Sequence, residues 1–159
     1  MPVEEANGLR FHTQHLGHAA DGDGPRPQVV MLHGLVIDNL SSWYYTIANP
    51  VALVADVHLV DLRGHGRSEM PESGYTVADN VADLEALLDV WGVDGPVHLV
   101  GNSFGGVVAL AYAHRHPDRV ASLFLIEAHF AVEGWGEHMA GSLALAAFGL
   151  DEDAVQAWL

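Results

Sequence analysis

Apolar residues in this chain gather in short continuous runs, and each run is followed by a polar or glycine-containing turn. Four such runs predict strands that are buried on both faces, as in a parallel sheet, at residues 28–35, 57–62, 97–101 and 120–127. An earlier segment, 9–16, alternates apolar and polar positions and predicts a strand with one exposed face. The chain is therefore rich in predicted strands along most of its length.

Helical spacing separates these strands. Residues 76–91 give the clearest helix, with apolar positions recurring every three or four residues and Gly92 ending it. Residues 43–54 also predict a helix, interrupted by Pro50, and residues 103–114 predict a third, stopped by Pro117. Strands alternating with helices predict an α/β fold with a mostly parallel sheet and helices on both faces. The loops that follow the strands should then meet at one edge of the sheet.

One of these loops carries a chemical motif. The run from Gly101 to Gly106 reads Gly-Asn-Ser-Phe-Gly-Gly, so that Gly-x-Ser-x-Gly falls between a predicted strand and a predicted helix. This is the context of a nucleophile elbow, in which Ser103 stands on a strained turn with its hydroxyl above the sheet. The start of the following helix would direct free backbone N–H groups at negative charge developing beside that serine.

Two further motifs complete a pattern. His33-Gly34 ends one strand, and the sequence Asp61-x-Arg63-Gly64-x-Gly66-x-Ser68 ends the next. With the motif at Ser103, in this order, the chain resembles the serine-nucleophile branch of the α/β-hydrolase superfamily. The resemblance implies an α/β-hydrolase core over 1–127 and the start of a helical lid or cap over 128–159. It corresponds to the N-terminal part of a usual member, with the C-terminal strands apparently missing. The other interpretation of 128–159 is an amphipathic helical end that packs on the sheet.

The resemblance also assigns roles. Ser103 would be the nucleophile, and the backbone N–H groups of Leu35 and Phe104 would form the oxyanion hole. Family members place the acid and the histidine later in the chain, and Glu127, at the end of a strand beside the elbow strand, is a candidate acid. The other interpretation of Glu127 is a strand-end carboxylate that is solvated or bonded to a loop. His129 and His138 are weak candidates for the base, because neither matches the family position.

Other polar residues near these motifs have structural interpretations. His33 is expected to hold its loop by a hydrogen bond, and His65 to belong to a turn. Asp61 and Arg63 are expected to brace the neighbouring loop rather than to react.

Composition narrows the possible partners. The 159 residues carry a formal net charge of −15, and all six basic residues are arginine, which argues against nucleic acid and anionic membranes as partners. There is no cysteine, which excludes disulfides and thiolate chemistry. The acidic N-terminus lacks the features of a signal peptide, so a cytoplasmic protein is expected. No cofactor or metal is expected, the partner should be a small-molecule substrate, and the oligomeric state is open.

The function predicted from the sequence is a serine hydrolase that cleaves an ester, a thioester or a similar small carbonyl compound through an acyl-enzyme. Gly101 to Gly106, followed by His-Pro-Asp-Arg-Val at 116–120, also resembles hydrolases that cleave carbon–carbon bonds in ring-fission products. A serine at 103 argues against the dehalogenase and epoxide-hydrolase branches, which use aspartate there. From a different class, the chain could be an inactive fragment or a non-catalytic ligand-binding module.

Overall fold

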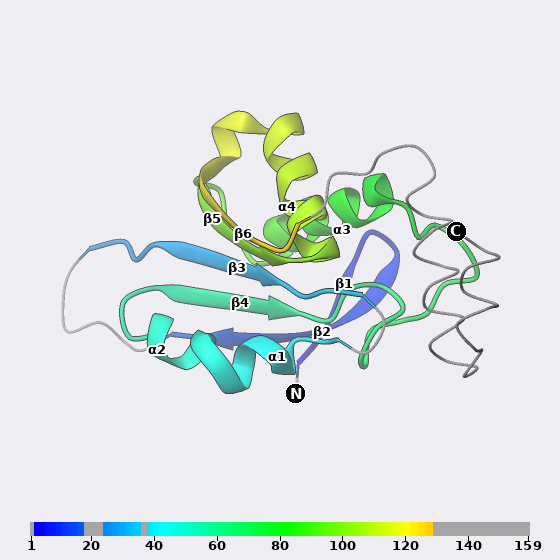
Figure 1. Ribbon diagram of the computed structural model, residues 1–159, viewed down its shortest axis with the longest axis horizontal. Coiled ribbons are helices and arrows are strands. Elements are labelled where there is room, and N and C mark those ends of the chain that lie inside the picture. Colours follow the sequence, from blue (N-terminus) through cyan, green and yellow to red (C-terminus); the bar gives the residue numbers. More distant parts are fainter. Residues whose placement is uncertain (1, 18–23, 36–37, 129–159) are drawn as a thin grey trace, which may run out of the picture. The chain divides into compact units, whose positions relative to one another are not determined.

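A six-stranded sheet organises the molecule, with strand order β1-β2-β4-β3-β5-β6 (Figure 1). The structure, a computed structural model, describes residues 2–17, 24–35 and 38–128. The strands are β1 (Val3–Ala6), β2 (Leu9–Leu16), β3 (Gln28–Leu32), β4 (Asp56–Val60), β5 (Val97–Asn102) and β6 (Val120–Ile126). Strands β4, β3, β5 and β6 are parallel, whereas β1 and β2 pair antiparallel. The predicted mostly parallel sheet is confirmed.

Helices lie on both faces of this sheet. They are α1 (Ser41–Trp43), η1 (Tyr44–Ala48), α2 (Asn49–Val51), α3 (Val77–Val90), α4 (Phe104–Arg115) and the short η2 (Pro117–Arg119). Figure 1 shows α3 and α4 grouped together, apart from α1 and α2, which lie beside β2 and β4. Alternate residues of β3 follow this division. Val30 and Leu32 pack in a core with α3 and α4, while Val29 and Met31 pack in a second core with the α1–α2 segment.

Helix α3 begins and ends as the sequence predicts. Thr76 and Asp79 form a capping box at its start, each side chain bonded to the other residue's backbone N–H. Its last residue is followed by Trp91, and Gly92 then takes a φ of 66°, a conformation in which glycine has no steric penalty. The boundaries of this helix are therefore determined locally.

The helical segment before β4 differs from the prediction. It spans 41–51 rather than 43–54, and its middle, η1, is a π-helix between two short α-helical turns. The wider turn lies directly before Pro50, which has no N–H and whose ring crowds the carbonyl four residues earlier. The proline thus modifies this helix without ending it at once.

Strand β1 is absent from the sequence prediction. It forms a hairpin with β2 through Asn7 and Gly8, whose φ angles are 47° and 73°. Asn-Gly between two strands is a strong hairpin signal, since both central residues of a type I′ turn need positive φ. That dipeptide was the available evidence for a strand at 3–6.

His15 of β2 and His58 of β4 lie side by side on two neighbouring strands. His58 of β4 donates from Nε2 to Gln28 Oε1 at 2.7 Å, and its Nδ1 lies 2.8 Å from Nδ1 of His15. Its ring stacks on Trp91 with centroids 4.8 Å apart, and Trp91 in turn donates to Glu4. Burial, reinforced by the nearby His15, lowers the pKa of His58 to about 4. His58 is therefore neutral in the folded protein near pH 7.

This environment makes stability depend on pH. An unfolded chain binds a proton at His58 near pH 6.5, whereas the folded chain resists until about pH 4, so stability falls as the pH drops through this interval. We expect the His58 contribution to reach about 3 kcal/mol at the acidic end. His58→Phe keeps a ring against Trp91 but cannot titrate. Urea unfolding at a series of pH values should show a weaker acid loss in this variant.

The exposed His114 supplies the matched control, since His114→Gln should keep the pH dependence of the parent protein. Equal pH dependence in His58→Phe and the parent protein would contradict the role given to the buried ring.

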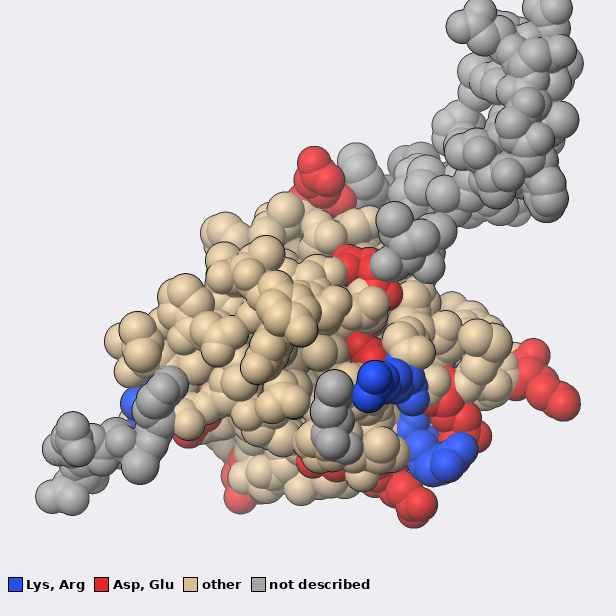
Figure 2. Space-filling view, turned by 90° about the horizontal axis from the view of Figure 1, so that it is seen from below, with Lys and Arg blue, Asp and Glu red and all other residues tan. Residues whose placement is uncertain are grey.

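Charge is unevenly distributed over the surface. The segment 39–55 contains no Asp, Glu, Lys or Arg. Figure 2 shows one face of the molecule, with a broad uncharged area left of its centre and charged side chains near and right of the centre and along the lower edge. None of the helices in the described ranges has the length and hydropathy needed to cross a membrane. Of the predicted lid over 128–159, all but Ala128 lies outside the described residues.

Candidate active site

Ser103 stands at the junction between β5 and α4, where the sequence motif predicts a sharp turn. Its backbone has φ 49° and ψ −116°, a combination that costs a non-glycine residue about 1–3 kcal/mol. The Ser103 N–H donates to the Ile126 carbonyl at 2.8 Å, and the Ser103 carbonyl accepts from Gly106 and Val107 in the first turn of α4. The strained residue is therefore held from both sides, by β6 and by the helix.

Two glycines allow the helix and the loop after β3 to approach each other. A Cβ on Gly105 would lie 2.3 Å from the Leu32 carbonyl oxygen and 2.5 Å from that of His33. A Cβ on Gly34 would lie 3.5 Å from Ser103 Cβ. The start of α4 thus packs directly against the backbone that ends β3, and the His-Gly loop lies beside Ser103.

Gly34 is fixed at both of its backbone polar groups. Its N–H donates to Asp38 Oδ2 at 2.7 Å, and its carbonyl accepts from His33 Nδ1 at 2.7 Å. Burial alone would raise the pKa of the Asp38 carboxyl, but hydrogen bonds from Ser42, Gly34 and Asn39 outweigh it and hold that pKa below its usual value. Asp38 is thus an anion that orders this loop. The expected role of His33, holding the loop by a hydrogen bond, is confirmed.

Leu35 and Phe104 follow these fixed positions. Phe104 is the first residue of α4, so its N–H has no carbonyl partner within the helix. Leu35 directly follows Gly34 and is 40% exposed. Within the described ranges, neither backbone N–H donates a hydrogen bond. No other described residue therefore accepts a hydrogen bond from either N–H.

Glu127 and Ser103 directly follow two paired strands. Strands β5 and β6 pair in parallel up to Asn102 opposite Ile126, and Ser103 and Glu127 are the first residues after them. Glu127 is exposed and has a φ of 49°, the same positive value as Ser103. Two adjacent chain turns at this edge of the sheet thus have left-handed backbones.

The structure describes His65 but neither of the two histidines considered as the base. His129 and His138 lie outside the described residues. His65 belongs to a turn, as predicted, and its Nδ1 bonds to the Arg63 carbonyl at 2.9 Å. Across the described ranges, no histidine is hydrogen-bonded to Ser103.

Asp61 connects three segments of the chain through its carboxylate. Its carboxylate accepts from the N–H of Leu40 at 2.8 Å and of Arg67 at 2.9 Å, and pairs with His12 Nδ1 at 2.7 Å. Asp61 and His12 are both buried. The predicted bracing role of Asp61 is confirmed.

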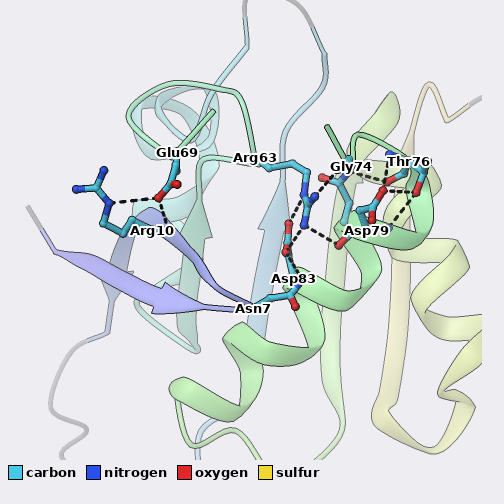
Figure 3. Close-up of polar contacts among 9 residues, drawn as sticks. Asn7, Arg10, Arg63, Glu69, Gly74, Thr76, Asp79 and Asp83 are labelled. Carbon is cyan, nitrogen blue, oxygen red and sulfur yellow. Dashed lines mark hydrogen bonds and ion pairs between the residues drawn. The ribbon is translucent and has the colours of Figure 1, made fainter. Parts of the chain in front are cut away.

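Arg63 braces the same region against α3 (Figure 3). Its Nε and Nη2 atoms donate to the two carboxylate oxygens of Asp83, both at 2.6 Å, and Asn7 donates to the same carboxylate at 2.8 Å. Arg63 also donates to the carbonyls of Gly74 and Asp79. The predicted bracing role of Arg63 is confirmed, and its partner is a helix that the sequence motif does not contain.

A pocket of about 560 Å³ adjoins this network, lined by residues that include His12, Tyr44, Tyr45 and Arg67. Ser103 does not line it, so we do not assign the reacting group to this pocket. In the described part of the chain, no cluster of three or more His, Asp or Glu residues could hold a metal ion.

Sequence reasoning missed Asp38 and His12. Asp38 had a recognisable signal, because aspartate in a loop commonly accepts backbone N–H bonds, here including that of Asn39 at 2.9 Å. His12 had none, since its partner Asp61 is distant in the sequence and follows a different strand, β4.

Comparison with known proteins adds three kinds of similarity. A family model described as "alpha/beta hydrolase fold" matches residues 27–155. The lipase LipV of Mycobacterium tuberculosis is 50% identical over 126 residues, which cover 79% of this chain and 44% of the lipase. The pimeloyl-[acyl-carrier protein] methyl ester esterase of Chromobacterium violaceum is 43% identical over 103 residues, covering 65% of this chain and 37% of the esterase.

Among solved structures, Est816, described as an N-acyl homoserine lactone degrading enzyme, superposes with a TM-score of 0.75 at 28% identity. The match covers 93% of this chain and 55% of that structure. The match spans less than half the length of each of these two curated relatives.

Proposed function

Because this chain belongs to the α/β-hydrolase fold family, we propose that it provides the nucleophile and oxyanion hole of a serine hydrolase that cleaves an ester, a thioester or a similar small carbonyl compound. The observation that carries the proposal is the backbone of Ser103, with φ 49° and ψ −116° between a strand and a helix. Strained geometry of this kind persists where the surrounding structure enforces it, and it concentrates at active sites.

In the proposed reaction, Ser103 Oγ attacks the carbonyl carbon and its proton passes to a general base. The carbonyl oxygen becomes an oxyanion, which would be bound by the N–H groups of Leu35 and Phe104. Collapse of this intermediate expels the alcohol or thiol and leaves an acyl-enzyme, which water then hydrolyses. A lost oxyanion donor typically reduces kcat by about 100-fold or more.

The base in this proposal is a histidine of this chain outside the described residues, with His129 and His138 as the candidates, and Glu127 is the proposed acid. Support for Glu127 is that it directly follows β6, as Ser103 directly follows the paired strand β5.

Substrate class follows from the site and from the relatives. Serine at 103 favours an acyl-enzyme, which suits carbonyl substrates. Relatives named as a lipase and as a methyl ester esterase support ester cleavage in particular. Carbon–carbon bond cleavage, the alternative that residues 101–106 and 116–120 suggest, has no such support from these two relatives.

A fluorophosphonate probe tests this proposal without knowledge of the substrate. Intact-mass analysis of the folded chain should show one adduct, and peptide mapping should locate it at Ser103. Ser103→Ala should remove the adduct because the nucleophilic oxygen is gone, while the circular dichroism spectrum stays unchanged.

Ser122→Ala on β6 is the matched control and should retain labelling at the parental rate, since Ser122 is exposed and bonded to His98. A folded parent protein that takes no label, or a label that persists in Ser103→Ala, would contradict the proposal.

A further inference from the structure

His33 is a fully buried histidine, with 0% exposure, whose two ring nitrogens have different partners. The Leu62 backbone N–H donates to Nε2 at 2.9 Å, so Nε2 must carry a lone pair. The other nitrogen, Nδ1, lies 2.7 Å from the Gly34 carbonyl oxygen, which can only accept. Both bonds form together only in the neutral tautomer that carries its proton on Nδ1.

The partner on Nε2 comes from a different loop. Leu62 follows β4, whereas His33 follows β3, and the two strands are parallel neighbours. The ring of His65, from the same loop as Leu62, packs on His33 with centroids 5.1 Å apart. The loop after β4, which contains Leu62 and His65, therefore sets both the tautomer and the surroundings of the His33 ring. Burial lowers the pKa of His33, which agrees with a neutral ring.

The bond to Gly34 controls the next peptide unit. In a planar trans peptide, the carbonyl of one residue and the N–H of the following residue point to opposite sides. Fixing the Gly34 carbonyl toward His33 therefore directs the Leu35 N–H away from it. Asp38 holds the Gly34 N–H at 2.7 Å, so the residue before Leu35 is restrained on both sides.

We infer that His33 is a positioning residue: held as the Nδ1–H tautomer by the Leu62 N–H, it orients the Gly34–Leu35 peptide so that the Leu35 N–H can bind the oxyanion. The inference rests on the proposed function for the use of that N–H. The tautomer and the peptide orientation do not depend on activity. His33 itself touches neither substrate nor nucleophile in this role.

Two variants separate the two ends of the ring. His33→Asn places an amide where Nδ1 stands and can still donate to the Gly34 carbonyl. His33→Gln places its amide where Nε2 stands, so it can accept from Leu62 but leaves the Gly34 carbonyl without its donor. We expect fluorophosphonate labelling to slow by about 100-fold in His33→Gln, as for loss of an oxyanion donor, and by less than tenfold in His33→Asn.

Nuclear magnetic resonance tests the inference independently of labelling. In the parent protein, long-range proton–nitrogen correlations of ¹⁵N-labelled histidine should show Nδ1 protonated and Nε2 unprotonated for His33 near pH 7. Residual dipolar couplings should report the same Leu35 N–H direction in His33→Asn as in the parent, and a different one in His33→Gln.

An Nε2–H tautomer or an imidazolium in the parent protein would overturn the inference, even if both variants fail to fold. An unchanged Leu35 direction in His33→Gln would also overturn it. A parent protein with the expected tautomer and N–H direction but no labelling would sustain the role of His33 in orienting the loop and would contradict the proposed function alone.

Discussion

Asp83→Ala should lower the free energy of unfolding by about 3–5 kcal/mol, because it leaves the guanidinium of Arg63 buried without its carboxylate. The two side chains are 6% and 5% exposed, so little water can replace the lost partner. Three donated hydrogen bonds disappear with the carboxylate, two from Arg63 and one from Asn7 (Figure 3). Urea unfolding followed by circular dichroism measures this loss.

Asp89→Ala is the matched control, since Asp89 is exposed on the same helix, and its effect should stay within about 0.5 kcal/mol. The double variant Arg63→Met, Asp83→Leu should recover much of the loss, because it removes both buried charges and fills the space. A loss below about 1 kcal/mol in Asp83→Ala, or no recovery in the double variant, would contradict this account of the pair.

Asp61→Ala is the second substitution with a large expected effect, about 4 kcal/mol of lost stability. It leaves the N–H groups of Leu40 and Arg67 and the ring of His12 without their common acceptor. These three donors come from three segments, so the loops at this edge of the sheet should lose their mutual alignment. The measurement is again the urea midpoint, combined with the fluorophosphonate labelling rate.

Asp61→Asn keeps one acceptor oxygen and should recover part of the stability, whereas its NH₂ group faces a donor and cannot recover all of it. Asp118→Asn, at an exposed position, removes the same charge and should be nearly neutral. Equal stability of Asp61→Asn and the parent would show that the carboxylate charge is unimportant there.

Local signals explain which parts of the fold could be predicted. The four parallel strands have continuous apolar runs because both of their faces are buried, and α3 carries its own capping box and terminal glycine. Strand β1 lacks such a signal, since Val3 is 58% exposed and two glutamates follow it. Only the Asn7-Gly8 turn indicated it.

The residues of the candidate site also divide into those that sequence motifs predict and those that they do not. Ser103, Leu35 and Phe104 belong to motifs whose spacing can be recognised along the chain. Asp38 bonds to residues within four positions of it, so its signal was local and was overlooked. His12 acts through Asp61, a partner that only the folded chain brings close. Which carboxylate accepts which N–H depends on how the strand ends approach each other, and no local pattern carries that information.

Two of the sequence motifs are in direct contact with each other in the folded chain. His-Gly and the motif from Asp61 to Ser68 look like separate signatures in the sequence. In the structure they share a hydrogen bond, from Leu62 to His33, and a ring contact between His33 and His65. They are two parts of one physical unit at the end of β3 and β4.

The backbone conformation of Ser103 bears on which residue type would be most stable at this position. At φ 49° and ψ −116°, glycine would be the residue of least steric cost, and a sequence optimised only for folding would carry it. This chain carries serine instead. Residue 103 is therefore a point at which the protein departs from its most stable sequence. It keeps a hydroxyl group in a backbone conformation in which glycine would have the lower steric cost.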